Sequence, residues 1–457
     1  MSRRQKPAKS LTRFDLLERL IAEVLQLSAP ADSVISAFFR ANKNLGMRDR
    51  AFYAETVWAV LRNRSWYTHL SAAGSGSMNR RFALLAVLDC FGPAGLAPDP
   101  ARKIFPQVSD QEQAWLAHVE SVRQTQIDPA VRESIPPWLY QEWVARLGPA
   151  EALACARAMN QTAPLDLRIN THLVKPAEVI DEFLSDQVSV TRFDFFPDAL
   201  RIEGKPALHK TKPFLRGWVE VQDLGSQCLA KLVHAKRGQF IVDFCAGAGG
   251  KTLAIGAALK NTGRLYALDV SATRLARLKP RLARSGLSNV WPSAITGPTD
   301  DRVKRLHGKA DAVLVDAPCS GLGTLRRNPD LKWRMTADRI GPLNEQQSEI
   351  LLQASRLVKS GGLLVYGTCS PLPQENELIV ERFLSEQPGF RRVSAQEILS
   401  AQRIDLPADW QAFTSAGDLM LWPYRTQTDG FYAAVLTRDY WGFPCRGGGG
   451  IIPRITH

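Results

Sequence analysis

The chain has 457 residues, a length that suggests about three domains at roughly 150 residues each. Hydrophobic residues make up 45% of it and charged residues 23%, which is the balance of a folded globular protein and excludes disorder as its main state. The formal net charge of +13, from 58 Lys and Arg against 45 Asp and Glu, favours an anionic partner, most simply a nucleic acid.

The sequence carries no pattern for a membrane span, a disulfide framework or a metal site. No run reaches the roughly 18 consecutive apolar residues of a membrane helix, and the basic N-terminal residues lack the apolar core of a signal peptide. The cysteines form no C-x-x-C pair and are widely spaced, at Cys90, Cys155, Cys228, Cys245, Cys319, Cys369 and Cys445. We therefore expect a cytoplasmic monomer with free thiols, no metal and no membrane partner.

The N-terminal part of the chain is expected to be helical. Apolar residues recur with the helical period in four segments, 14–25, 34–39, 50–62 and 82–91. No strand pattern interrupts them. The sequence therefore predicts an all-α domain over residues 1–135.

Residues 136–235 predict a small α+β module. Pro136-Pro137 marks its start, and a helical pattern follows over residues 138–159. Three strand-like segments come next, at residues 165–170, 188–193 and 218–222.

Residues 236–440 alternate between strand-like and helical segments. Strands are expected at 240–244, 264–268, 290–295, 312–315, 363–367 and 431–436, and helices at 251–259, 272–284, 345–357 and 375–384. This alternation is typical of a doubly wound, Rossmann-like sheet, whose ligands bind beyond the carboxyl ends of the strands. Residues 441–457 are expected to form a Gly-rich tail.

A loop of small residues, Cys245-Ala246-Gly247-Ala248-Gly249-Gly250, joins the first of these strands to a helix. It is not a P-loop, because Cys245 stands where the first glycine is required, and it is not a dinucleotide fingerprint, because Thr252 replaces the third glycine. Small residues let the backbone approach a ligand closely. We interpret the loop as a cofactor site rather than a structural turn.

Asp269 ends the second strand, about 20 residues after the loop. An acid at this place suits a ribose diol. The alternative is that it caps the helix that starts at Ser271-Ala272. Both roles remain open, and the preceding loop favours the ribose.

Two thiols follow different strands of the predicted sheet. Cys319 lies in Asp316-Ala317-Pro318-Cys319-Ser320-Gly321, and Cys369 lies in Gly367-Thr368-Cys369-Ser370. One cysteine at a strand end is as well explained as a small buried hydrophobic residue. Two at one sheet edge, beside an acid and a cofactor loop, favour chemistry.

These motifs together resemble the RsmB/Sun (Fmu) family of S-adenosylmethionine-dependent RNA cytosine-C5 methyltransferases. Supporting segments are similar too, at residues 165–170, 219–227, 325–333, 344–347, 375–377 and 429–431. The N-terminal part, with Met-Arg-Asp-Arg-Ala-Phe at residues 47–52, resembles the NusB-like RNA-binding domain of the ribosomal RNA members. The resemblance covers nearly the whole chain except the tail.

The resemblance implies covalent catalysis. A thiolate that adds to C6 of cytosine turns C5 into a carbon that can attack a sulfonium methyl group, and an acid at N3 stabilises the developing charge. In this family Cys369 would be the nucleophile, Asp316 would contact the base and Cys319 would assist product release, with Lys251 also in the catalytic set. The residues alone do not rank the two cysteines, and the Pro-Cys nucleophile of the DNA cytosine methyltransferases would point to Cys319.

The resemblance also implies S-adenosylmethionine as the cofactor. It would be held by Cys245, Ala246, Gly247, Ala248, Gly249, Gly250 and Lys251, with Asp269 at the ribose and Asp316 at the methyl end. The family's acid for the adenine amino group is missing after the third strand, where Thr296 and Asp300 are the candidates left open.

RNA is expected at a basic run after the Cys319 motif, formed by Arg326, Arg327, Lys332 and Trp333. Cations follow phosphates, and an aromatic ring can stack on an unpaired base. A solvated basic loop is the alternative.

The predicted function is methyl transfer from S-adenosylmethionine to C5 of a cytosine in RNA, most simply small-subunit (16S) ribosomal RNA. The alternatives are another RNA such as tRNA, a non-catalytic ribosome-assembly factor that binds RNA, and an amino-group methyltransferase. A pure binder has no use for two thiols at strand ends, and the Asn/Asp-Pro-Pro-aromatic motif of the amino-group enzymes is absent.

Overall fold

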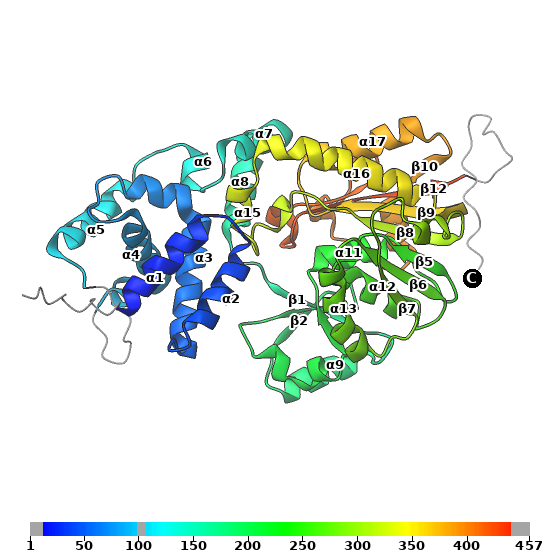
Figure 1. Cartoon of the computed structure of the whole chain (residues 1–457), viewed down its shortest axis with the longest axis horizontal. Coiled ribbons are helices and arrows are strands. Elements are labelled where there is room, and N and C mark those ends of the chain that lie inside the picture. The colour runs from blue at the N-terminus through cyan, green and yellow to red at the C-terminus, as the bar shows by residue number, and fades with distance from the viewer. Residues whose placement is uncertain (1–11, 98–106, 440–457) are drawn as a thin grey trace, which may run out of the picture.

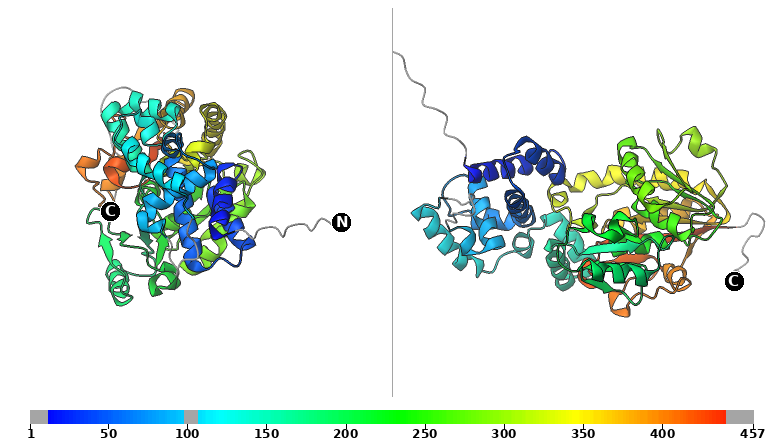
Figure 2. Two further views of the ribbon diagram at one scale, coloured as in Figure 1. Left: turned by 90° about the vertical axis from the view of Figure 1, so that its left-hand side faces the viewer. Right: turned by 90° about the horizontal axis from the view of Figure 1, so that it is seen from below.

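The computed structural model describes residues 12–97 and 107–439. Figures 1 and 2 show a lobe of N-terminal helices beside a larger part that contains the sheets. Among the described residues, no helix combines the length and apolar character that crossing a membrane requires. The predicted Gly-rich tail, residues 441–457, lies outside the described residues.

The N-terminal lobe is built from helices in the part of it that the structure describes, as predicted. Its helices are α1 (Arg13–Leu25), α2 (Ala31–Ala41), α3 (Met47–Leu70), α4 (Met78–Phe91), α5 (Asp110–Arg123) and α6 (Pro129–Arg132). Thr12 and Asp15 form a capping box that starts α1. The apolar faces of these helices share one core, which includes Leu17, Tyr53 and Leu84.

Two helices link this lobe to the rest of the chain. They are α7 (Pro137–Leu147) and α8 (Pro149–Asn160). Each has proline in its first turn, where the backbone N–H that proline lacks would make no hydrogen bond within the helix. We predicted them as the start of the small module. In the structure Leu139 and Trp143 share a core with Tyr366 of the large sheet, because their apolar face needs a larger partner than a short four-stranded sheet.

The small sheet is antiparallel, with strand order β2-β3-β1-β4. Its strands are β1 (Leu165–Ile169), β2 (Val190–Arg192), β3 (Ala199–Ile202) and β4 (Val219–Val221), and α9 (Pro176–Ser185) and α10 (Lys212–Leu215) accompany them. Leu167 and Val219 pack against Val179 and Phe183 of α9. The four-residue strand β3 was not predicted.

The large sheet has the order β10-β12-β9-β8-β5-β6-β7, and β11 pairs with β12 outside this path. Its strands are β5 (Phe240–Asp243), β6 (Arg264–Asp269), β7 (Val290–Ala294), β8 (Ala310–Asp316), β9 (Val358–Thr368), β10 (Phe390–Val393), β11 (Leu419–Leu421) and β12 (Phe431–Arg438). Strands β5 to β9 pair in parallel, and β12 runs antiparallel to β9. The predicted doubly wound, Rossmann-like sheet is confirmed.

Helices cover both faces of the large sheet (Figure 1). One core joins the sheet to α7, α8, α16 (Ile340–Ser355) and α17 (Glu377–Glu386). The other joins it to α11 (Leu224–Lys231), α12 (Gly250–Ala258), α13 (Ala272–Ser285) and α18 (Ala395–Ser400). Short helices α14 (Asp301–Lys304), α15 (Leu331–Arg334) and α19 (Pro423–Thr426) lie in the connections.

The strand order reverses between β5 and β8. After β5 the chain builds outward through β6 and β7, and it then returns to place β8 on the other side of β5. Ligands of open α/β sheets bind at such a switch point, beyond the carboxyl ends of the strands. Asp243, Asp269, Asp316 and Thr368 end β5, β6, β8 and β9 at this edge.

Candidate active site

The small-residue loop lies at the switch point, between β5 and α12. The Phe244 amide donates to Leu314 O at 2.8 Å, and the Ala246 amide donates to Leu268 O at 2.9 Å, so both neighbouring strands hold the loop. Gly249 has φ +85°, and a β-carbon there would lie 2.2 Å from the Leu278 side chain. Only glycine fits this turn.

Asp269 holds the loop from the next strand. Its carboxylate accepts from the Gly247 amide at 2.7 Å and from the Ser271 amide at 2.7 Å. The helix-capping alternative is not needed, since the Ser271 hydroxyl caps α13 by accepting from the Arg274 amide. Asp269 therefore lies beside the loop, where the predicted ribose contact requires an acid.

Cys245 is a poor candidate for a nucleophile. Its pKa is raised well above the ordinary thiol value because it is buried and lies near Asp243, Asp316 and Asp269. A thiol in such surroundings keeps its proton. Cys245 was predicted to lie in the cofactor loop, and a role there would use its backbone and its small size rather than its thiol.

Lys251 and Asp316 form an ion pair across the switch point. Lys251 Nζ lies 2.8 Å from Asp316 Oδ2 and 5.4 Å from the centre of the Phe431 ring. Burial lowers the pKa of Lys251, but the Asp316 carboxylate and the nearby Cys369 thiol outweigh it, and the net shift is upward. Lys251 is thus a cation held by Asp316 and close enough to Cys369 for their charges to interact.

The two predicted thiols meet. Cys319 Sγ lies 3.5 Å from Cys369 Sγ, although 50 residues separate them in the chain. The pKa of Cys319 is raised well above its ordinary value, by its hydrogen bond to Cys369, by burial and by the charges of Cys369 and Glu375. Cys319 therefore keeps its proton and can donate it to a Cys369 thiolate.

Comparison with known proteins decides the family. The family model for the 16S rRNA methyltransferase RsmB/F matches residues 230–437, and the RsmF/B-like ferredoxin-like domain matches residues 135–209. A protein of Synechocystis named "Probable ribosomal RNA small subunit methyltransferase B" is 34% identical over 324 residues, which cover 69% of this chain and 69% of that protein. The chain belongs to the RsmB/F methyltransferase family.

Solved structures share the RsmB/F fold. The protein titled "Crystal Structure of PH0851" superimposes with a TM-score of 0.71 at 24% identity and covers 95% of this chain and 100% of its own. NSun6 from Pyrococcus horikoshii, solved with SFG, gives a TM-score of 0.57 at 20% identity and covers 67% of this chain and 99% of its own.

The loop after β7, where RsmB/F proteins are expected to hold adenine, is closed by Asp300. Asp300 accepts from the Thr296 amide at 2.8 Å, from the Thr296 hydroxyl at 3.0 Å and from the Arg302 guanidinium at 2.7 Å. These donors lower the pKa of Asp300 below its ordinary value. The two residues predicted as candidates for contacting adenine, Thr296 and Asp300, are therefore hydrogen-bonded to each other.

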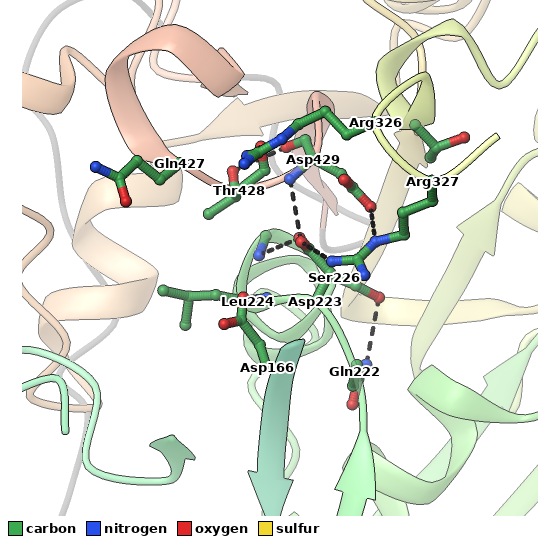
Figure 3. Close-up of polar contacts among 12 residues, drawn as sticks. Asp166, Gln222, Asp223, Leu224, Ser226, Arg326, Arg327, Gln427, Thr428 and Asp429 are labelled. Carbon is green, nitrogen blue, oxygen red and sulfur yellow. Dashed lines mark hydrogen bonds and ion pairs between the residues drawn. The ribbon is translucent and has the colours of Figure 1, made fainter. Parts of the chain in front are cut away.

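Arg326 and Arg327, which were predicted to bind RNA, both have hydrogen-bond partners within the protein. Arg326 is only 6% exposed and donates to Thr162 O and Thr428 O. Figure 3 shows Arg327 between two acids: its guanidinium donates to Asp429 at 2.6 Å and to Asp223 at 2.9 Å. Arg326 is therefore held by backbone carbonyls and Arg327 by two carboxylates of the protein itself.

Lys332 and Trp333, the other two residues of the predicted RNA patch, also bond to the protein itself. Lys332 is 1% exposed, and its ammonium donates to Arg62 O and to Asn160 Oδ1, each at 2.7 Å. The Trp333 indole donates to Leu61 O at 2.7 Å. These side chains join the segment after Cys319 to α3 of the helical lobe.

Sequence reasoning missed a set of polar residues behind the two thiols. Glu375, Asn376 and Gln347 are fully buried and bond to the residues that flank Cys319 and Cys369. Their segments were noticed only as part of the family resemblance, without a role. A run of adjacent acids and amides directly after a catalytic motif was the available signal.

Among the described residues, no group of three or more His, Cys, Asp or Glu side chains could hold a metal ion.

Proposed function

We propose that this protein transfers the methyl group of S-adenosylmethionine to C5 of a cytosine in small-subunit ribosomal RNA, through a covalent bond between Cys369 and C6 of the base. The observation that carries the proposal is the pair of thiols 3.5 Å apart, next to the Lys251–Asp316 ion pair. Methyl transfer to oxygen or to an exocyclic amine needs no such thiol pair.

The edge of the sheet fits S-adenosylmethionine. The turn through Gly247 and Gly249 opens at the start of α12, and no side chain caps that helix, which leaves backbone amides for a ligand. Asp269 supplies a carboxylate for a ribose diol. The cofactor, when bound, supplies an electrophilic methyl group on a sulfonium sulfur.

The two thiols divide the work by their surroundings. Cys369 lies near the Lys251 ammonium, which stabilises a thiolate, and Cys319 lies 3.5 Å away, where its thiol would donate a hydrogen bond to that thiolate. Cys369 is therefore the nucleophile that adds to C6. After methyl transfer a base takes the C5 proton, the C6–S bond breaks with its electron pair returning to sulfur, and Cys319 assists by donating a hydrogen bond to the departing Cys369 thiolate. Asp316, held by Lys251, contacts the base by accepting from its 4-amino group, and the Lys251 ammonium supplies the positive charge that stabilises the charge developing on the ring.

Ribosomal RNA is proposed as the substrate because the relatives with this family's domain are named for it. The helical lobe, proposed to bind RNA, joins the segment that follows Cys319 through Lys332 and Trp333. The proposed domain limits are residues 1–135, 136–235 and 236–440, and the protein is proposed to act as a monomer in the cytoplasm.

Covalent trapping tests the proposal. RNA that carries 5-fluorocytosine cannot lose its C5 substituent, so the enzyme should remain bound to it through Cys369. We expect a denaturation-resistant complex with the wild type and with Cys319→Ala, and none with Cys369→Ala. No complex with any of the three would favour a ribosome-assembly factor or an amino-group methyltransferase, and a complex with tRNA alone would change the substrate.

A further inference from the structure

One buried carboxylate lies behind both thiols. Glu375 is 0% exposed and ends the short turn between β9 and α17. Its Oε1 accepts from the Ser320 amide at 2.8 Å and from Gln347 Nε2 at 3.0 Å. Its Oε2 accepts from the hydroxyls of Ser320, at 2.6 Å, and Ser370.

Three of the four donors come from the two loops that carry the cysteines, and the fourth, Gln347, comes from α16. Ser320 follows Cys319 directly, and Ser370 follows Cys369 directly. The two hydroxyls also lie 3.2 Å from each other. Gln347 extends the network, since its amide nitrogen donates to Pro318 O at 3.0 Å as well as to Glu375.

Asn376 fixes the second loop from the other side. It accepts from the Thr368 hydroxyl at 2.5 Å and donates to Ser370 O at 2.8 Å, so it contacts both neighbours of Cys369. The Tyr366 hydroxyl donates to the backbone carbonyl of Glu375 at 2.7 Å and anchors the turn to β9.

No Lys, Arg or His is paired with Glu375 among the residues that the structure describes. A carboxylate buried without a cation is costly and requires its hydrogen bonds. If Glu375 served only the stability of the fold, apolar side chains of the same volume would serve equally well. The arrangement is therefore explained by the geometry that it imposes on the two loops.

We propose that Glu375 is a positioning residue that sets the separation of the Cys319 and Cys369 sulfur atoms, by binding Ser320 and Ser370 on one carboxylate. Its catalytic meaning rests on the proposed function, whereas the thiol separation does not. A glutamine at this position has one accepting oxygen and one donating nitrogen, so it cannot satisfy all four donors. The two loops then lose their common anchor.

The experiment compares Glu375→Gln with Glu381→Gln in the full chain. Glu381 is an exposed carboxylate on α17 and serves as the matched control. The thiol separation is measured without RNA or cofactor, as the rate at which diamide oxidises Cys319 and Cys369 to a disulfide, followed by peptide mass spectrometry. We expect wild type and Glu381→Gln to react at equal rates and Glu375→Gln to react at least about tenfold more slowly.

Activity gives the second measurement. A displacement of about 1 Å costs on the order of 10²-fold in rate, so kcat should fall about that much in Glu375→Gln, with KM for the cofactor within about twofold. Since Glu375 also raises the pKa of Cys319, alkylation of Cys319 should begin at lower pH in this variant. A purely structural role would move neither the disulfide rate nor this pH profile at unchanged melting temperature.

Equal disulfide rates and equal kcat in Glu375→Gln and the control would overturn the proposal, and so would a wild type that forms no Cys319–Cys369 disulfide. If Glu375→Gln fails to fold, Ser370→Ala removes one of the four bonds and is judged by the same two rates. If the wild type forms the disulfide but methylates no cytosine, the proposed function fails, and the role of Glu375 is still decided by the disulfide rates.

Discussion

At the scale of single residues, Lys251 gives the two thiols different surroundings. It pairs with Asp316 at 2.8 Å, and its raised pKa reflects both that acid and Cys369. Cys319, by contrast, is surrounded by burial and by negative charge that raise its pKa. This difference in surroundings supports the proposal, first made from the family resemblance, that Cys369 is the nucleophile.

Lys251→Met should lower kcat by about 10²-fold or more, because a preorganised charge at the reacting groups is lost. Lys279→Met, a change at an exposed position of α13, is the control and should keep wild-type kcat. Steady-state methyl transfer measures both variants. A Lys251→Met enzyme with normal kcat would remove the lysine from the catalytic set.

Asp243 should make stability depend on pH. Burial raises its pKa to about 7 from an ordinary 3.8, although the Thr252 hydroxyl lowers it. Between about pH 4 and pH 7 the folded protein therefore keeps a proton that the unfolded chain has lost. This contribution is present below pH 4 and is lost as the pH rises through 7, at up to about 1.4 kcal/mol per pH unit.

Asp243→Asn removes this titration. Its melting temperature relative to wild type should rise between pH 5 and pH 8, as measured by thermal melts in matched buffers. A difference that stays constant over this range would show that Asp243 is already ionised in the folded protein.

Asp300→Ala should raise the KM for S-adenosylmethionine several-fold without abolishing activity. The change releases the Thr296 amide and hydroxyl that Asp300 now holds and loosens the loop proposed to bind adenine. Initial rates at varied cofactor concentration measure it, with Asp301→Ala at the neighbouring exposed acid as the control. An unchanged KM would take Asp300 out of the cofactor site.

At the scale of elements, the segment between Cys319 and α16 is a connector. Arg327 binds Asp223 after β4 and Asp429 before β12, and Gly323 donates to Cys369 O and accepts from Gly430. A β-carbon at Gly323 would lie 2.2 Å from Gly430 O. The segment thus ties the small sheet, the last strand and the nucleophile together.

Arg327→Gln should destabilise the protein by about 3 kcal/mol, because two buried carboxylates lose their cation. The slope of RNA affinity against salt should stay that of wild type, since Asp223 and Asp429 already hold the Arg327 guanidinium. Urea unfolding and filter binding over a salt series measure the two effects, with the exposed Arg339→Gln as the control. A flatter salt slope at unchanged stability would restore Arg327 to the RNA interface.

The strongly periodic helices, such as α1, α12 and α13, the parallel strands and the presence of Cys319 and Cys369 at one sheet edge could be predicted from the sequence, whereas α5, α9 and α11 were not predicted. Apolar periodicity defines the strands, and the ends of parallel strands share one edge. The burial of Lys332 could not be predicted, because its partners Arg62 and Asn160 lie 270 and 172 residues away in the chain. The residues next to Lys332 in the sequence give no sign of these distant partners.

At the scale of the whole molecule, three parts meet at one sheet edge. The helical lobe contacts the segment after Cys319 through α3, and the small sheet contacts it through Asp223. α7 and α8 share the core of the large sheet. RNA held by the outer parts would therefore reach a catalytic edge whose position they help to fix.

The most direct test of this account is the transfer of labelled methyl from S-adenosylmethionine to unmodified small-subunit ribosomal RNA, with nucleoside mass spectrometry of the product. Naked RNA and isolated small subunits are both offered to wild type and to Cys369→Ala. The account predicts 5-methylcytidine with wild type and none with the variant. Product that persists in Cys369→Ala, or a methylated nucleoside other than 5-methylcytidine, would contradict it.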